Sequence, residues 1–196
     1  MQFVQPIRSL KQISQIKNML LGEGNIRDLL LFELGINSAL RASDLLRITV
    51  WDVYNSEWHA REYFEMREKK TGKRSRITIT PKLLGTLGLY RNTYPNVVAS
   101  PDNFLFFAKK SLPLGADHIG RIQMWKIVNR ITEAVGIQES MGCHSLRKTF
   151  GYCARKQWVD VSLVQFKLNH SNLATTKRYL WLSDEELSEA CNKLDL

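Results

Sequence analysis

The sequence predicts a mainly helical domain of the α+β class, with a small three-stranded antiparallel sheet near its edge. Apolar residues recur at helical spacing over most of the 196 residues. Three short runs between positions 48 and 80 are instead rich in β-branched and aromatic residues, which favours strands. The composition shifts nowhere enough to mark a boundary, so residues 1–196 are expected to form a single domain.

The chain is expected to begin with two helices and a short third one. Residues 9–21 carry apolar side chains at helical spacing, with Ser9 as a candidate N-cap. Asn25 can cap a second helix, which we expect to end near Gly35 because Gly is common just after a helix. The third helix is expected to begin around Ala42.

The three strand candidates follow directly. They are ITVWDV (48–53), EYFEM (62–66) and RITIT (76–80), and the last of them alternates strictly between polar and apolar residues. Thr71 and Gly72 lie between the second and third runs and are typical of a turn. The three runs therefore predict the antiparallel sheet.

The rest of the chain is expected to be helical, apart from one long loop. Pro81 suits the first position of a helix, where its missing amide hydrogen does no harm. Helices resume from about Asp117, and Ser183 with Glu186 forms a capping box for a last helix over 183–196. Breaks between these helices are expected near 136–142, 158–159 and 169.

The charge of the chain indicates a polyanionic partner. Its 28 Lys and Arg residues against 19 Asp and Glu residues leave a net charge of +9, and the isoelectric point is about 9.6. Such a balance favours nucleic acid first and an acidic membrane surface second. Charge alone therefore favours a nucleic acid as the partner over a membrane surface.

The cysteines and the apolar runs indicate the compartment. Cys143, Cys153 and Cys191 are an odd number without CxxC spacing, which predicts neither a disulfide framework nor a zinc site. No run approaches the roughly 18–20 apolar residues of a membrane span, and no signal peptide is recognisable. A cytoplasmic protein is therefore expected.

Three clusters of polar residues suit attack on a phosphodiester. Two guanidinium groups, from Arg41 and Arg147, match the geometry of the non-bridging oxygens. Imidazoles can donate hydrogen bonds or move a proton, and Tyr179 can act as a nucleophile within a cationic field. The clusters are Arg41 with Asp44, His144 with Arg147, and His170 followed by Tyr179.

Two simpler interpretations stay open on these residues alone. His144 and Arg147 are three apart and fit the solvated face of a basic helix, with Leu146 and Phe150 on the stripe that faces the core. Tyr179 equally fits a half-buried tyrosine of the core.

The order and spacing of these residues resemble the tyrosine recombinases of the phage integrase family. The first arginine box of that family is similar to LRASDLLRITVWDV, the second to HSLRKTF and the third to LNHSNLATTKRYL. The family's β-hairpin resembles KKTGKRSRITIT. The resemblance covers the chain from about Pro6 to Leu182 and implies the catalytic-domain fold of these enzymes.

The resemblance also implies a function. It implies a site-specific recombinase, of the integrase or excisionase type, with double-stranded DNA as its partner, action at the nucleoid and no membrane association. Such an enzyme would cut and rejoin DNA through a 3′-phosphotyrosyl link to Tyr179. Arg41 and Arg147 would clamp the scissile phosphate, and Asp44 would support Arg41. No cofactor is expected, because the covalent link conserves the energy of the phosphodiester and the arginines take the place of a metal ion.

The remaining roles follow from the same resemblance. His144 would act as a base and His170 would hydrogen-bond the phosphate. Lys70, in the hairpin turn, would protonate the leaving oxygen, with Lys73 as its rival. Basic residues expected to contact DNA phosphates are Lys73, Arg74, Arg76, Lys148 and Lys177.

Two positions depart from the family pattern. Asn169 stands where the family commonly has Gly before its third-box histidine, but Asn is the next-best residue for a left-handed turn. Lys148 stands where many members have a second histidine, and basic residues are tolerated there. Both changes leave the catalytic groups in place.

Family members usually carry a helical DNA-binding domain before the first box, and at most a few dozen residues precede Arg41 here. We therefore expect either the catalytic half of a longer protein or a natural short member like the fimbrial switch recombinases. Residues 183–196 are expected to dock on a neighbouring protomer in a tetramer on DNA, with a monomer in its absence. Alternative functions are a non-catalytic DNA-binding module on the same fold and DNA relaxation by a type IB topoisomerase.

Overall fold

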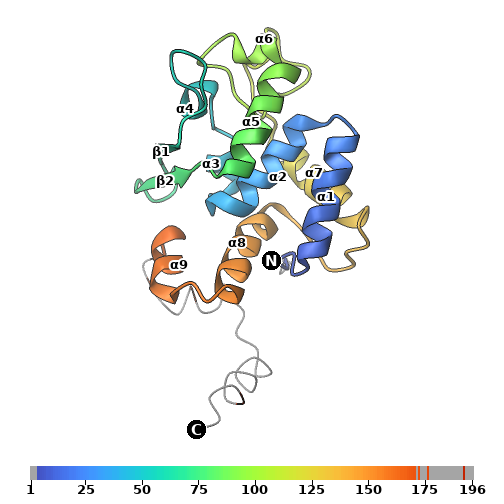
Figure 1. Cartoon of the computed structure of the whole chain (residues 1–196), viewed down its shortest axis with the longest axis vertical. Helices are drawn as coiled ribbons and strands as arrows, with labels where there is room; N and C mark the ends of the chain where they lie inside the picture. The colour runs from blue at the N-terminus through green and yellow to red at the C-terminus, as the bar shows by residue number, and fades with distance from the viewer. Residues whose placement is uncertain (1–3, 171, 173–175, 177–191, 193–196) are drawn as a thin grey trace.

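The computed structural model describes residues 4–170, 172, 176 and 192. Within them, helices dominate and a single hairpin of two strands lies at one side (Figure 1). The elements are α1 (Leu10–Gly22), α2 (Ile26–Ser38), α3 (Ala42–Leu45), α4 (Val50–Val53), β1 (Tyr63–Arg67), β2 (Arg74–Thr78), α5 (Pro81–Thr93), α6 (Pro95–Val98), α7 (Arg121–Glu133), α8 (Cys143–Lys156) and α9 (Val161–Lys167).

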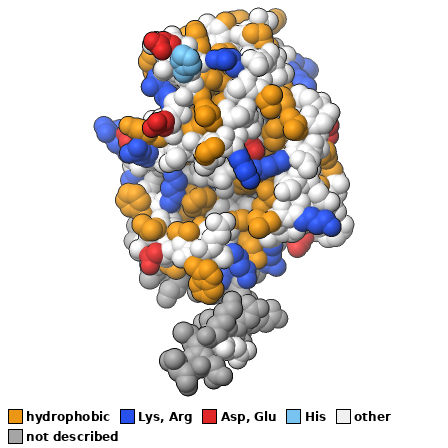
Figure 2. Space-filling model, in the orientation of Figure 1, with side chains coloured by type: hydrophobic (Ala, Val, Ile, Leu, Met, Phe, Trp, Pro, Cys, Tyr) orange, Lys and Arg blue, Asp and Glu red, His pale blue; other side chains and the backbone are white. Residues whose placement is uncertain are grey.

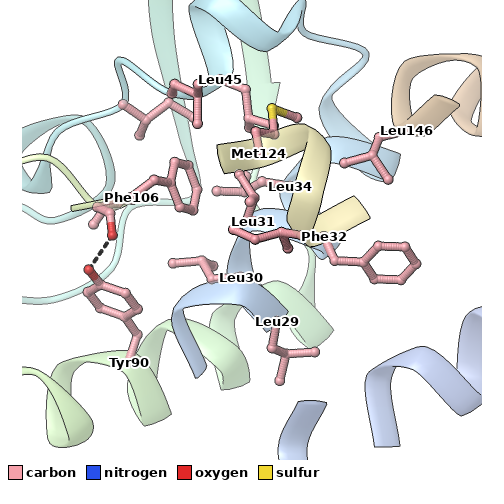
Figure 3. Close-up of a cluster of buried hydrophobic side chains, with 14 of the residues drawn as sticks. Leu29, Leu30, Leu31, Phe32, Leu34, Leu45, Tyr90, Phe106, Met124 and Leu146 are labelled. Atoms are coloured by element: carbon pink, nitrogen blue, oxygen red, sulfur yellow. Dashed lines mark hydrogen bonds between the residues drawn. The ribbon is translucent and has the colours of Figure 1, made fainter. Parts of the chain in front are cut away.

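The helix α2 forms the centre of the fold. All of its residues from Ile26 to Gly35 are buried, as expected for a helix that is apolar on nearly every side. It packs against α1, α3, α5 and α8. Figure 3 shows its leucines pointing toward residues of other elements, among them Leu45, Phe106 and Met124.

Polar groups inside this core find partners. The Tyr90 hydroxyl donates to the Leu105 carbonyl, drawn as a dashed line in Figure 3. The Tyr54 hydroxyl donates to the Leu87 carbonyl at 2.7 Å. Burial raises the pKa of both phenols well above the ordinary value, so both stay neutral donors.

The first two helices begin as expected, but the second ends later. The Ser9 side chain caps α1 by accepting from the Gln12 amide at 3.3 Å. The expected end of α2 near Gly35 is wrong, since the helix continues to Ser38 and the left-handed residue is Ala39, at φ +60°. Gly35 instead lets α8 approach, because a Cβ there would lie 2.5 Å from Cδ1 of Leu146.

The expectation of a third strand over 48–53 is also wrong, and the sheet has two strands in the described part of the chain. Val50–Val53 is the short helix α4, opened by a capping box in which the Asp52 carboxylate accepts the Thr49 amide at 2.8 Å. Val50 and Val53 are both buried at helical spacing. This capping and burial override the strand propensity of the β-branched residues.

The hairpin itself forms as the alternation predicts. β1 and β2 are antiparallel, with Phe64 opposite Ile77 and both side chains buried. The turn between them includes Gly72 at φ +66°. The polar members of the strands therefore face away from the core, and the turn projects from the body of the domain (Figure 1).

The C-terminal half of the described chain follows the expected breaks. α7 and α8 are separated over 134–142 and α8 and α9 over 157–160, and Asn169, at φ +50°, follows the end of α9. The last helix expected over 183–196 lies outside the described residues. Across the part of the chain that is described, no helix combines the length and apolar character that crossing a bilayer requires.

Candidate active site

A cleft of about 430 Å³ opens between α3, the hairpin turn and the beginning of α8. Of the described residues that line it, none is acidic, so the cleft offers a field that attracts anions. The side chains with a guanidinium, ammonium or imidazole group on its wall are Arg41, Arg47, Lys69, Lys70, His118, Arg121 and His144.

Arg41 is the N-cap residue of α3, and its side chain lines the cleft. Its backbone is extended, and its carbonyl accepts the amides of Asp44 at 2.9 Å and Leu45 at 2.8 Å. Its guanidinium forms an ion pair with the buried carboxylate of Glu68, through Nη1 and Oε2. The helix start thus fixes the backbone of Arg41, while Glu68 fixes its charged end.

Glu68 gathers four donors around one buried carboxylate. Besides Arg41, it accepts from Asn169 at 2.6 Å, Ser75 at 2.8 Å and Thr71 at 3.0 Å. Burial alone would raise the pKa of Glu68, but the hydrogen bonds from Asn169 and Ser75, the charge of Arg41 and the bond from Thr71 together lower it. The carboxylate therefore stays ionised and holds Arg41 at neutral pH.

Asp44, expected to support Arg41, accepts the backbone amide of Lys69 at 2.8 Å through Oδ1. Its side chain is completely buried. The carboxylate therefore anchors the start of the hairpin turn, and the ion pair to Arg41 comes from Glu68 instead. Lys69 and Lys70 reach the cleft from this anchored turn.

The hairpin divides its basic residues between the cleft and the solvent. Lys70 lines the cleft, and Lys73 is exposed outside the cleft lining. Arg74 and Arg76 are exposed, and the Arg76 guanidinium stacks 3.6 Å from the centroid of the Tyr63 ring. Lys and Arg side chains project from the side of the molecule that carries the hairpin (Figure 2).

His144 occupies the first turn of α8 and is exposed to the cleft. Reduced hydration there, followed by the charges of Arg121, Arg147, Lys148 and Arg41, lowers its pKa below the ordinary value. The start of a helix also disfavours a cation. His144 is therefore a neutral imidazole near pH 7, the form that can accept a proton.

Arg147 lies one turn further along α8 and is only 2% exposed. Its guanidinium donates to the carbonyl oxygens of Ala39 and Leu168, and Nη2 lies 3.5 Å from Nε2 of His170. The left-handed turn at Ala39 turns that carbonyl toward the arginine. Two segments distant in sequence, at Ala39 and at residues 168–170, thus orient one guanidinium.

His170 follows the left-handed residue Asn169, as the sequence predicted for that bend. Its Nδ1 lies 3.1 Å from the Thr176 hydroxyl, and its Nε2 faces Arg147. Burial, then the charges of Arg147 and Arg41, against an opposing effect of Glu68, lower its pKa to about 4. The ring is neutral at pH 7, and because Arg147 can only donate, the ring proton belongs on Nδ1.

The two histidines show that the predicted residues converge. The charges of both Arg41 and Arg147 lower the pKa of His144 and also that of His170. Arg41, Lys70 and His144 line the same cleft, while Arg147 and His170 lie in contact beside it. The nucleophile expected at Tyr179, like Lys177, lies outside the described residues.

Lys148 departs from its expected role as a phosphate contact. Its side chain is turned into the protein, is 6% exposed and donates to the Val4 carbonyl at 2.8 Å. Burial lowers its pKa. We therefore do not keep Lys148 among the proposed phosphate contacts, because its ammonium ties the N-terminal segment to α8.

Sequence reasoning missed several residues of the site. Glu68 carries no sequence signal of its own, since only the hairpin and the end of α9 together surround it with donors. Arg47, Lys69 and Arg121 are basic residues of the cleft wall. Arg47 lies inside the first box and Lys69 is the first residue of the hairpin motif, so both motifs offered a signal for these residues.

The described residues also contain no cluster of three or more His, Cys, Asp or Glu side chains arranged as metal ligands. The expectation that the arginines neutralise the phosphate without a metal stays a prediction.

Comparison with known proteins shows a consistent set of relatives. The model of the phage integrase family matches residues 8–186. The probable integrase/recombinase YoeC of Bacillus subtilis (strain 168) is 37% identical over 194 residues, which cover 99% of this chain and 98% of YoeC. The chain spans only about half of several other curated relatives, which are named tyrosine recombinases.

Solved structures share the fold at low sequence identity. The crystal structure of XerA recombinase has a TM-score of 0.75 at 19% identity, over 96% of this chain and 63% of XerA. The XerH site-specific recombinase, in a post-cleavage complex with palindromic difH substrate, has a TM-score of 0.70 at 21% identity, over 87% of this chain and 46% of XerH.

Proposed function

The chain belongs to the phage integrase family, whose members are tyrosine recombinases, and we propose that it is a catalytic domain that cuts and rejoins double-stranded DNA at specific sites. One observation carries this proposal at the level of residues. Arg41, Lys70, His144, Arg147 and His170 come from four separate segments and meet in and beside one basic cleft.

In the proposed reaction the Tyr179 oxygen attacks the scissile phosphorus and the bond from phosphorus to the 5′ oxygen breaks. His144 accepts the phenolic proton, for which its neutral state at pH 7 is suited. Lys70 gives a proton to the departing 5′ oxygen, which leaves as a hydroxyl. The products are a 3′-phosphotyrosyl link and a free 5′ end, and attack by another 5′ hydroxyl reverses the step.

Arg41 and Arg147 neutralise the charge on the non-bridging oxygens in the transition state. Both are oriented before DNA binds, Arg41 by Glu68 and Arg147 by two backbone carbonyls. Such preorganisation is the form in which fixed charges lower a barrier most effectively.

His170 is proposed to hydrogen-bond the phosphate from Nε2. This requires the ring proton to move from Nδ1 to Nε2 when DNA binds. Thr176 permits the change, because its hydroxyl can either accept from Nδ1–H or donate to a bare Nδ1 at the same 3.1 Å separation. Asp44 is proposed to support the reaction through the hairpin turn, by holding the Lys69 amide.

The surface around the cleft supports contacts to the DNA backbone. Lys73, Arg74 and Arg76 are exposed on the hairpin, and Arg47 and Arg121 lie on the cleft wall. We propose that these side chains, together with Lys177, contact phosphates and contribute affinity without reading sequence.

We further propose that residues 1–196 act as one catalytic domain, and that residues 183–196 dock on a neighbouring protomer within a tetramer on DNA. Deleting the residues after Leu182 should then weaken assembly of the tetramer on DNA. The free energy of unfolding of the isolated chain should stay close to that of wild type. A deletion that abolishes folding would count against this arrangement.

Covalent capture tests the proposed function directly. The chain is incubated with a pool of nicked duplexes that carry a randomised core, and adducts that survive denaturation are isolated and sequenced. We expect wild type to form adducts whose released strand has a 5′ hydroxyl, Tyr179→Phe to form none, and Tyr152→Phe to match wild type. An adduct of undiminished yield with Tyr179→Phe would refute the assignment.

A further inference from the structure

The end of α9 is attached to the hairpin through the side chain of Asn169. Its Nδ2 donates to Oε1 of Glu68 at 2.6 Å and to Oγ of Ser75 at 2.8 Å. An amide –NH₂ has two hydrogens and can satisfy both acceptors at once. Gly, the residue that the family resemblance leads us to expect here, allows the same left-handed backbone but offers no donor.

The two acceptors of Asn169 lie on opposite sides of the turn that carries Lys70. The Glu68 backbone receives the Gly72 amide at 2.9 Å and donates to the Lys73 carbonyl at 3.0 Å. The Ser75 hydroxyl donates to the same Glu68 carboxylate at 2.8 Å. A side chain bound to both Glu68 and Ser75 therefore holds both arms of the turn.

A second attachment lies two residues earlier, where the Lys167 ammonium donates to the Arg76 carbonyl on β2. The carbonyl of Leu168, between them, accepts from Arg147, and His170, the next residue after Asn169, also faces Arg147. Along residues 167–170, contacts to the hairpin thus alternate with contacts to Arg147. The segment links the two sides of the phosphate-binding cleft.

We propose that Asn169 is a positioning residue, which holds the hairpin turn so that Lys70 meets the leaving oxygen. This inference rests on the proposed function. Asn169 acts through Glu68 and Ser75 and does not itself touch the reacting atoms. Loss of its amide leaves the fold and the arginines in place but lets the turn move, so proton delivery by Lys70 becomes slow.

The test compares two leaving groups in a single-turnover assay of adduct formation, on a duplex selected by the covalent capture above. In one substrate the 5′ bridging atom is oxygen, and in the other it is sulfur. A thiol has a pKa of about 8.5, so the sulfur leaves without a proton donor. A defect in proton delivery therefore slows cleavage of the oxygen substrate alone.

We expect Asn169→Gly to slow the oxygen substrate about ten- to a hundredfold and to leave the sulfur substrate within about threefold of wild type. Lys70→Ala should show the same pattern, whereas Arg41→Ala should slow both substrates. Asn169→Asp should be slower than Asn169→Gly, because its carboxylate would face Glu68. Asn129→Ala is the matched control, since it loses only a bond to the Trp125 carbonyl on α7.

If wild type is active and Asn169→Gly cleaves the oxygen substrate equally fast, this inference is overturned but the proposed function is not. An Asn169→Gly variant that is slowed equally on both substrates would also overturn this inference, because the amide would then serve the arginines or the fold. A wild-type chain that forms no adduct with either substrate would overturn the proposed function and this inference with it.

Discussion

Nη2 of Arg147 lies 3.5 Å from Nε2 of His170, with the arginine as donor and a neutral imidazole as acceptor. The pair joins α8 to the segment that follows α9, and it depends on the histidine remaining uncharged. Protonation of the ring would place two cations side by side at the edge of the cleft. The stability of the fold should therefore respond to acid through this contact.

The pKa of His170 is about 4 in the folded chain and near 6.5 when the chain is unfolded. Between these values the unfolded chain binds a proton that the folded chain does not, so the free energy of unfolding falls as pH drops from 7 to 5. We expect His170→Gln to remove about 1 kcal/mol of this fall, a figure reduced for partial exposure of the ring. Urea unfolding at both pH values measures it.

The control for this acid response is His59→Gln, which alters an exposed histidine that lies beside Glu57. Its unfolding free energy should fall with pH as wild type does. Equal pH dependence in wild type and His170→Gln would contradict the neutral state of His170. The remaining dependence in His170→Gln is expected to come in part from His144, whose pKa is lowered as well.

Gly35→Ala should destabilise the fold although Ala favours helices. The added Cβ would lie 2.5 Å from Cδ1 of Leu146, which forces α2 and α8 apart. We expect a loss of about 1–3 kcal/mol in the free energy of unfolding. Gly85→Ala in α5 meets no atom within 4 Å and should instead stabilise by about 0.5–1 kcal/mol. Opposite signs in urea unfolding are the expected result, and a stabilising Gly35→Ala would disprove the close approach.

Lys148 and Lys73 should separate folding from DNA binding. Lys148→Met removes a buried ammonium that donates to the Val4 carbonyl, so it should alter the free energy of unfolding. The salt dependence of DNA affinity should stay as in wild type. Lys73→Met removes an exposed charge and should make the negative slope of log K against log salt shallower by roughly 0.9. A shallower slope with Lys148→Met would show that Lys148 contacts a phosphate.

Asp44 should affect cleavage through the Lys69 amide. Asp44→Ala removes the acceptor of that amide and should slow adduct formation about tenfold by freeing the turn, whereas Asp44→Asn keeps an acceptor and should slow it less. Asp52→Ala is the matched control, because it removes a carboxylate from the Thr49 amide away from the cleft. Asp52→Ala should lower the free energy of unfolding without changing the rate of adduct formation by the folded protein. Equal slowing of adduct formation by Asp44→Ala and Asp52→Ala would contradict the proposed role of Asp44.

Local patterns predicted most elements because their causes are local. The cap at Ser9, the alternation in β2 and the left-handed bend at Asn169 each depend on a few neighbouring residues. The prediction over 48–53 was wrong because strand propensity competes there with a capping box and with burial of both valines. Gly35 was misread because its reason lies in Leu146, on a helix distant in sequence.

The sequence by itself determined the types and order of the groups suited to phosphoryl transfer, and the periodicity that makes the domain mainly helical. Only the tertiary structure decided that Glu68 rather than Asp44 pairs with Arg41, that Lys148 is buried, and that Asn169 reaches the hairpin. The physical reason is that an ion pair or a lowered pKa depends on which groups share a volume from which water is excluded. Segments far apart in the chain build that volume jointly.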